Sequence, residues 1–117
     1  DAVLDTAEIY TPSPAGWAPT VNPMSFQRAG DAAVALADGT VLLAGGADAM
    51  GTVLDSAEVF DPSVDDFFLF GDTAFSPRVF HDMTLLNDER VLLCGGLTTF
   101  TSGTPTASCE MYDATAD

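Results

Sequence analysis

The residues of this chain that could carry out chemistry are few. It has one histidine, His81, and two cysteines, Cys94 and Cys109, beside 18 acidic residues and only three arginines. Nucleophilic catalysis needs a nucleophile, a histidine base and an orienting acid in one place, and a single histidine offers little material for such a set. The two Gly-Gly pairs lack the Lys and Ser or Thr that follow in a phosphate-binding loop. We therefore expect no enzyme activity, no catalytic residue and no cofactor.

The charge of the chain is strongly one-sided. Its formal net charge is -15, and such a surface repels nucleic-acid backbones, which bind through Lys and Arg, and anionic membrane surfaces. No apolar run approaches the roughly 20 residues of a membrane-spanning helix. We expect neither a nucleic-acid partner nor membrane insertion. An excess of carboxylates is typical of proteins that stay dispersed in a salty or extracellular setting.

One acidic cluster, Asp61, Asp65 and Asp66, consists of the residue type that binds calcium. Its position in a turn-like segment favours a solvated turn, and a Ca²⁺ site is the alternative interpretation. On the favoured interpretation the chain holds no metal.

The chain repeats itself after fifty residues. The matched segments are 3–10 with 53–60, Arg28 with Arg78, Asp38 with Asp88, and 41–46 with 91–96. Without gaps, residues 1–46 and 51–96 share fifteen identities, where chance agreement would give about three. A third copy of the Ala-Glu segment follows at residues 108–113, after a two-residue insertion in the loop 97–107. The repeat therefore defines the architecture of the chain.

Each repeat unit consists of short apolar segments joined by turns. Asp38-Gly39 lies between two such segments and is a hairpin signal, and the pairs Gly45-Gly46 and Gly95-Gly96 end a strand where no side chain fits or the backbone bends sharply. No segment longer than ten residues shows the period of a helix. We expect an all-β fold of antiparallel strands. The expected strands are 4–10 and 16–20, then 31–36, 41–44, 55–60 and 67–70, then 81–86, 91–94 and 108–112.

The pattern resembles kelch repeats. It contains Arg-x-x-His or Asp, then Asp-Gly-x-Val-Leu-Leu-x-Gly-Gly, then an Ala-Glu pair with an aromatic residue and Asp-Pro, as in Arg28–Gly46 and Ala57–Pro62. The likeness is to secreted bacterial and galactose-oxidase-like kelch repeats, and it covers nearly the whole chain, about two and a quarter repeats. It implies four-stranded antiparallel blades of a β-propeller. Kelch repeats often carry histidine at the position of His81, which implies a structural residue there.

The resemblance also implies a division of the chain. Within a single kelch-repeat segment, 1–117, we expect the end of one blade at 1–22, a complete blade at 28–72 and most of a third at 78–117. Closed propellers have about four to eight blades. We therefore expect an incomplete propeller that is an excerpt of a longer one.

For the function we expect a non-catalytic propeller segment that serves as a protein-interaction or structural module, outside the cell or at its surface. Its partner would be another protein or further blades of the same polypeptide. Connecting loops carry recognition in such folds, and the most variable connections are 47–54 and 97–107. The alternative is the kelch portion of a larger oxidase or lyase whose active-site residues lie outside this chain.

Two alanines of one repeat unit become cysteines in the next, since Cys94 replaces Ala44 and Cys109 replaces Ala57. Alanine at both positions indicates small, close-packed sites on adjacent antiparallel strands, where facing residues have a Cβ separation suited to a disulfide. We predict a cross-strand disulfide and, with it, an oxidising compartment. Two small buried thiols are the alternative.

The phased charges are expected to be structural. Glu8, Glu58 and Glu110 recur at one phase, and repeated copies of one environment suit a scaffold better than acid–base catalysis, which needs two carboxylates in different environments. Arg28 and Arg78 recur just before the first strand of a unit. Because a planar guanidinium can bond to a carboxylate and several carbonyls at once, we predict that both arginines are buried between blades and pair with a phased glutamate or with loop carbonyls.

Overall fold

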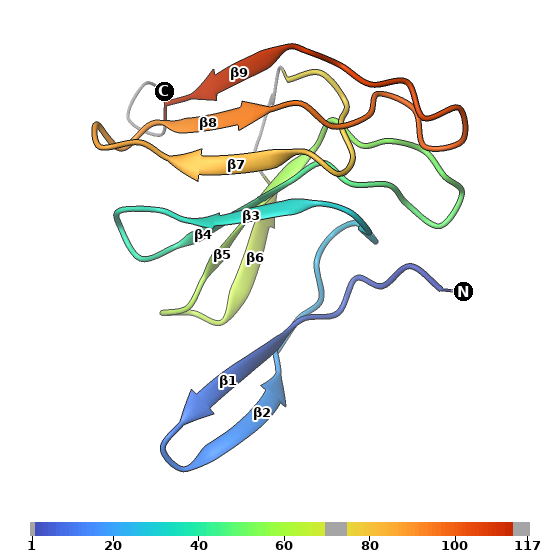
Figure 1. The fold of residues 1–117 in the computed structure, drawn as a ribbon. Coiled ribbons are helices and arrows are strands. Elements are labelled where there is room, and N and C mark those ends of the chain that lie inside the picture. Colours follow the sequence, from blue (N-terminus) through green and yellow to red (C-terminus); the bar gives the residue numbers. More distant parts are fainter. Residues whose placement is uncertain (1, 70–74, 114–117) are drawn as a thin grey trace.

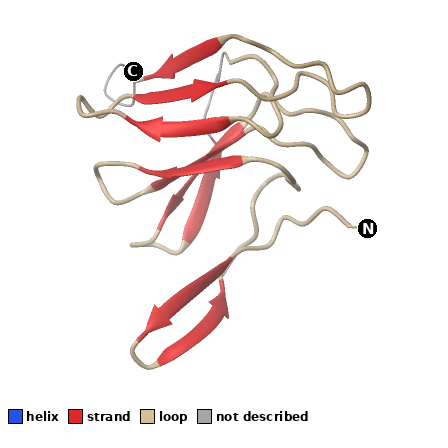
Figure 2. Ribbon diagram, in the orientation of Figure 1, coloured by secondary structure: helices blue, strands red, loops and turns tan. Residues whose placement is uncertain are grey.

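The computed structural model describes residues 2–69 and 75–113, and every regular element in them is a β-strand (Figure 2). The strands are β1 (Glu8–Pro12), β2 (Ala15–Pro19), β3 (Ala32–Ala35), β4 (Val41–Ala44), β5 (Ala57–Asp61), β6 (Asp66–Leu69), β7 (Asp82–Leu85), β8 (Val91–Cys94) and β9 (Cys109–Tyr112). They form antiparallel sheets in the orders β1-β2, β3-β4-β5-β6 and β7-β8-β9. The prediction of an all-β antiparallel fold is confirmed. In this described part no helix has the length and apolar character that crossing a membrane requires.

The expected strands match the observed ones closely, and the first differs most. It begins at Glu8 instead of residue 4, because the backbone before it bonds elsewhere: the carbonyl of Leu4 accepts the N–H of Arg28 at 3.0 Å, and that of Asp5 accepts the N–H of Met24 at 2.7 Å. Phe70, the expected end of the sixth strand, lies outside the described residues. So do residues 70–72 and 114–117 at the ends of the two later expected blades.

The three sheets follow one another in space as they do along the chain (Figure 1). The β1-β2 hairpin and the outer pair of the four-stranded sheet share one register, since Tyr10 faces Trp17 and Phe60 faces Phe67. The ring centroids of the two aromatic pairs are 5.1 and 4.9 Å apart, and both pairs are tilted by 50°. The fifty-residue repeat is therefore a repeat of structure as well as of sequence.

Strand β4 is apolar at every position because both faces of its sheet are covered. Leu42 and Ala44 are buried toward the three-stranded sheet. Val41 and Leu43, on the other face, line a crevice of about 140 Å³ that the β1-β2 hairpin closes from the opposite side. The remaining lining residues of this crevice are Ala7, Glu8, Ile9, Thr20, Phe60 and Phe67.

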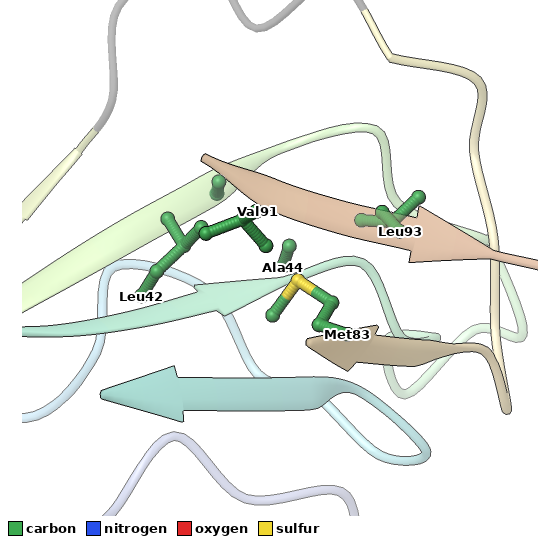
Figure 3. Packing of buried hydrophobic residues seen from close by; sticks show 6 residues of the cluster. Leu42, Ala44, Met83, Val91 and Leu93 are labelled. Atoms are coloured by element: carbon green, nitrogen blue, oxygen red, sulfur yellow. The ribbon is translucent and has the colours of Figure 1, made fainter. Parts of the chain in front are cut away.

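The core lies between the four-stranded and the three-stranded sheet (Figure 3). Its buried residues are Leu42, Ala44 and Ala57 on one side and Met83, Val91 and Leu93 on the other. The two sheets meet through opposite faces of their equivalent strands. Strand β4 therefore buries the second and fourth of its residues, and β8 buries the first and third. Full burial of one such leucine side chain contributes about 1.5–3 kcal/mol.

Candidate functional site

A buried ion pair connects the entry of the four-stranded sheet to its third strand. The guanidinium of Arg28 and the carboxylate of Glu58 lie 2.9 Å apart, and both side chains are completely buried. Nη1 of Arg28 also donates to the carbonyls of Gly45 (2.8 Å) and Ser56 (3.0 Å), and Nη2 donates to the Ser56 hydroxyl (3.2 Å). Because a buried charge is tolerated only when it is paired and hydrogen-bonded, this set of partners explains how an arginine can occupy the interior.

The three-stranded sheet contains the equivalent pair. Nη2 of Arg78 lies 2.8 Å from the carboxylate of Glu110, and the arginine side chain is fully buried while that of the glutamate is 30% exposed. Nη1 donates to the carbonyls of Gly95 (3.0 Å) and Ser108 (2.8 Å), and Nη2 to the Ser108 hydroxyl (2.9 Å). Both phased arginines are thus buried and bonded to a phased glutamate and to carbonyls, as the sequence predicts.

The backbone of each arginine bonds to a connecting segment of one sheet, while its side chain bonds to the next sheet. The N–H of Arg28 donates to the carbonyl of Leu4 at 3.0 Å and that of Arg78 to the carbonyl of Leu54 at 3.4 Å. The carbonyl of Arg78 in turn accepts the N–H of Gly46 at 2.8 Å. The arginines therefore join consecutive sheets. They are buried between structural units, as expected, and they bond to one unit through the backbone and to the next through the side chain.

Glu8, the third phased glutamate, behaves differently. It is exposed at the start of β1, and its side chain makes no hydrogen bond or ion pair with any residue that the structure describes. The structure therefore places two of the three phased glutamates in the expected structural role.

The Gly-Gly pairs bring the backbone into close contact with neighbouring segments. Gly46 and Gly96 have φ of 92° and 85°, and a Cβ on them would lie 3.0 and 2.5 Å from the carbonyl oxygens of Ala29 and Val79. Gly45 and Gly95 also have positive φ, but only a Cβ on Gly45 would collide, at 2.5 Å from the carbonyl of Arg78. Glycine is thus required at these positions by conformation, and at three of them also by space.

His81, like Arg78, lies at the contact between the four-stranded and the three-stranded sheet, beside Gly45. It is buried, and neither ring nitrogen has a hydrogen-bond partner among the described residues. Burial lowers the pKa of His81 and the Arg78 charge lowers it further, while the Ala44 backbone and the carboxylates of Asp31 and Asp82 act in the opposite direction. The arrangement favours a neutral imidazole that packs against Gly45, in agreement with a structural residue.

The predicted disulfide is present. Cys94 and Cys109 face each other on β8 and β9, with Cα atoms 4.2 Å apart and a bond between their sulfur atoms. Their counterparts Ala44 and Ala57 face each other on β4 and β5 and are buried in the core. The cysteines are half-buried and exposed, because they lie on the face of the three-stranded sheet that points away from that core. The expectation of close packing therefore applies to the alanines only.

The acidic turn residues do not converge on one point. Asp61 accepts hydrogen bonds from the N–H and hydroxyl of Ser63, while Asp65 accepts one from the N–H of Val21 and Asp66 one from the side chain of Asn22. These bonds close the β5-β6 turn and tie it to the segment after β2. Across residues 2–69 and 75–113 no three His, Cys, Asp or Glu side chains gather in a way that could hold a metal ion.

The two variable connections lie at the same end of their sheets, and the second carries an aromatic residue, Phe100, that contacts Phe80 from the segment before β7. Phe80 is 59% exposed and Phe100, in the loop 97–107, is 45% exposed, and their ring centroids lie 5.9 Å apart. Hydroxyl groups of Thr99, Ser102 and Thr104 bond to one another beside them in the loop. Exposed aromatic pairs bordered by polar groups are typical of contact surfaces.

Phe80 also has an unusual backbone. Its φ is +58°, and a bulky residue in this left-handed region is strained. Phe80 occupies the repeat position of Gly30, which has φ +70°. The sequence carries this signal as a glycine replaced by phenylalanine at one repeat phase.

No protein-family model matches this chain, and no curated protein matches it. The geometry described above therefore carries the functional conclusion by itself.

Proposed function

We propose that this chain is a segment of a kelch-type β-propeller that serves as a non-catalytic protein-interaction or structural module outside the cell or at its surface. Three features support this. Consecutive antiparallel sheets follow a fifty-residue repeat. Their apolar faces meet in a common core. Buried arginines join one sheet to the next. The Cys94–Cys109 disulfide supports an oxidising compartment.

The observation that carries an interaction role is the aromatic pair Phe80 and Phe100. A strained, exposed phenylalanine in place of Gly30 costs folding free energy, about 1–3 kcal/mol for such a backbone. One edge of the ring packs against Gly30 of the neighbouring sheet, and we assign the exposed remainder, beside Phe100, to binding. With 18 acidic residues on the chain, the surface favours a partner with positive charge around an apolar contact, because complementary potentials steer association.

The test separates binding from folding. Phe80→Gly removes the strain together with the side chain, so we expect the unfolding free energy to change by less than about 1 kcal/mol while partner capture is lost. Phe100→Ser should lose capture too. Phe68→Ser is the matched control, because Phe68 is also exposed (50%) but lies on β6, away from the loops.

The measurement is cross-linking of the immobilised chain in an extracellular protein mixture, followed by quantitative mass spectrometry. Proteins that the wild type and Phe68→Ser capture, and that Phe80→Gly and Phe100→Ser do not, support the proposal. Equal capture by all four proteins contradicts it.

A further inference from the structure

Two backbone hydrogen bonds hold the segment before β7 against the four-stranded sheet, where β3 and β7 lie side by side (Figure 1). The carbonyl of Arg78 accepts the N–H of Gly46 at 2.8 Å. The N–H of Phe80 donates to the carbonyl of Gly30, also at 2.8 Å. Phe80 has its strained φ of +58° here, and such a conformation persists only where the surrounding structure enforces it. The position of Phe80 therefore depends on the contact between the two sheets.

His81, the next residue, is enclosed at this contact and is only 8% exposed. A Cβ added to Gly45, directly after β4, would lie 2.6 Å from Cε1 of the imidazole ring. A Cβ added to Gly96, in the segment after β8, would lie 2.9 Å from the Cβ of His81. Both sheets that enclose the ring belong to residues 2–69 and 75–113, so its surroundings are formed by the described chain itself.

This enclosure suits a neutral imidazole. Neither Nδ1 nor Nε2 has a hydrogen-bond partner among the described residues. Burial lowers the pKa of His81 most, and the charge of Arg78 lowers it further; the Ala44 backbone and the carboxylates of Asp31 and Asp82 act in the opposite direction but are outweighed. A proton would place a second positive charge beside Arg78, with two N–H donors that lack acceptors. Because a buried charge without partners is costly, the protonated ring favours separation of the sheets.

We propose that His81 is a pH-sensitive switch for the surface formed by Phe80 and Phe100. With a neutral ring the sheets stay in contact, and Phe80 is held beside Phe100. With a protonated ring the two backbone hydrogen bonds open, and the strained backbone of Phe80 relaxes away from this position. The use of the switch in binding rests on the proposed function of this surface, whereas the opening of the contact does not. Acidification should therefore release a bound protein.

Acid favours the open form because that form binds the proton more tightly. In the open form His81 meets water and has the ordinary histidine pKa of about 6.5, while in the closed form its pKa is lower. Below this pH the open form carries more protons than the closed form. The ratio of open to closed molecules then rises by up to about tenfold per pH unit.

Hydrogen exchange followed by NMR tests the opening in the intact chain. The amides of Phe80 and Gly46 donate the two hydrogen bonds. Their protection should fall at least about tenfold between about pH 7 and pH 5, after correction for the pH dependence of intrinsic exchange. They should also remain less protected than the paired amides of β4 and β5, because the contact opens before the four-stranded sheet unfolds. Equal protection at these two places would show global unfolding and overturn the switch.

The variants assign the opening to the histidine ring. His81→Asn does not titrate and should show no loss of protection at Phe80 and Gly46. In the wild type, ring resonances of the single histidine should give a pKa below the ordinary value of about 6.5. Asp82→Asn should lower this pKa further, since the carboxylate of Asp82 favours the protonated ring. Glu89→Gln is the matched control, because Glu89 is an exposed carboxylate in the β7-β8 turn, and it should leave the pKa unchanged.

Partner capture at about pH 7.5 and about pH 5.5, on either side of the ordinary histidine pKa, tests the release. The wild type should lose its captured proteins at the lower pH, and His81→Asn should keep them. Equal loss from both proteins overturns the switch, as does unchanged protection of Phe80 and Gly46 or an ordinary pKa of His81. Absence of capture at the higher pH overturns the proposed function of the surface instead, and hydrogen exchange then decides whether the contact opens.

Discussion

The guanidinium of Arg28 and the carboxylate of Glu58 lie 2.9 Å apart without solvent exposure on either side chain, whereas the carboxylate partner of Arg78 is 30% exposed. The two equivalent pairs therefore differ in whether water can reach the glutamate when its arginine is removed. A fully buried carboxylate without its arginine stays uncompensated, whereas a partly exposed carboxylate is rehydrated. The cost of removing each arginine should differ accordingly.

We predict that Arg28→Ala lowers the unfolding free energy by about 3–5 kcal/mol, as for one partner of a buried pair, and that Arg78→Ala costs less. Urea unfolding at neutral pH measures both. Arg90→Ala is the control for loss of an arginine, because Arg90 is exposed and pairs with Asp88 in its own turn, and it should leave stability nearly unchanged. Equal effects for all three variants would contradict the assignment of Arg28 and Arg78 as interior ties.

Replacement of both charges should be milder than removal of one. In Arg28→Met/Glu58→Leu neither side chain leaves an uncompensated charge, and buried ion pairs can be replaced by apolar residues at little cost. The double variant should therefore be more stable than Arg28→Ala in the same urea series. Its cost does not vanish, because the N–H groups of Ser25 and Phe26 lose their acceptor on Glu58. A double variant less stable than the single one would contradict this account.

The disulfide should contribute to stability through the unfolded state. Cys94 and Cys109 are 15 residues apart, and closure of such a loop is worth about 3 kcal/mol in the chain-entropy model. Cys94→Ala/Cys109→Ala restores the alanine pair of the sister sheet, and it should lower the unfolding free energy by about 2–4 kcal/mol. Reduction of the wild type with a thiol should give a similar loss and should leave the double variant unaffected. A stable reduced wild type would contradict the prediction.

Most of the secondary structure could be predicted from the sequence, because the repeat allowed each strand to be checked against its copy. The disulfide and the arginine pairs were predictable for the same reason, since residues of unusual type recurred or changed together. The face that each strand buries was not. Val-Leu-Leu is apolar throughout, so only the stacking of sheets decides that Leu42 is buried on β4 while Val91 and Leu93 are buried on β8.

Two features of the candidate sites depend on tertiary contacts and escaped prediction. The backbone N–H groups that bind Glu58 come from residues 25 and 26. The types of these side chains do not show where the backbone N–H groups point. The contact of Phe80 with Phe100 joins the segment before β7 to the variable loop 97–107. Sequence comparison can show that Phe80 replaces a glycine, but it cannot show which side chain the phenylalanine meets.

Stability should fall in mildly acidic solution because of His81. Burial lowers the pKa of His81 in the folded state, and Arg78 lowers it further, so below about pH 6.5, the ordinary value for histidine, the unfolded chain binds more protons than the folded one. The unfolding free energy must then decrease as the pH falls through this window, by at most about 1.4 kcal/mol per pH unit for one group. Urea unfolding between pH 7.5 and 5 measures the slope, and His81→Asn should flatten it. An equal slope in the variant would assign the effect to carboxylates instead.

Gly45 and Gly95 allow backbone conformation to be separated from packing between sheets. Their φ values are 71° and 73°, so alanine at either position suffers the same conformational penalty, about 1 kcal/mol or more. Only at Gly45 would the new Cβ meet the next sheet, 2.5 Å from the carbonyl oxygen of Arg78 and 2.6 Å from the ring of His81; at Gly95 it would have open space. Backbone must shift to relieve such a contact.

We therefore predict that Gly45→Ala lowers the unfolding free energy by at least about 1–3 kcal/mol more than Gly95→Ala, the usual cost of forcing extra volume into a packed site. Thermal or urea unfolding of the two variants side by side gives this difference, with the conformational cost cancelled. The Gly45→Ala variant should also shift the amide resonance of Gly46, which donates to the Arg78 carbonyl at 2.8 Å. Equal losses from both variants would mean that the backbone at Arg78 and His81 shifts without a cost in unfolding free energy. The sheets would then be joined by the arginine side chains alone.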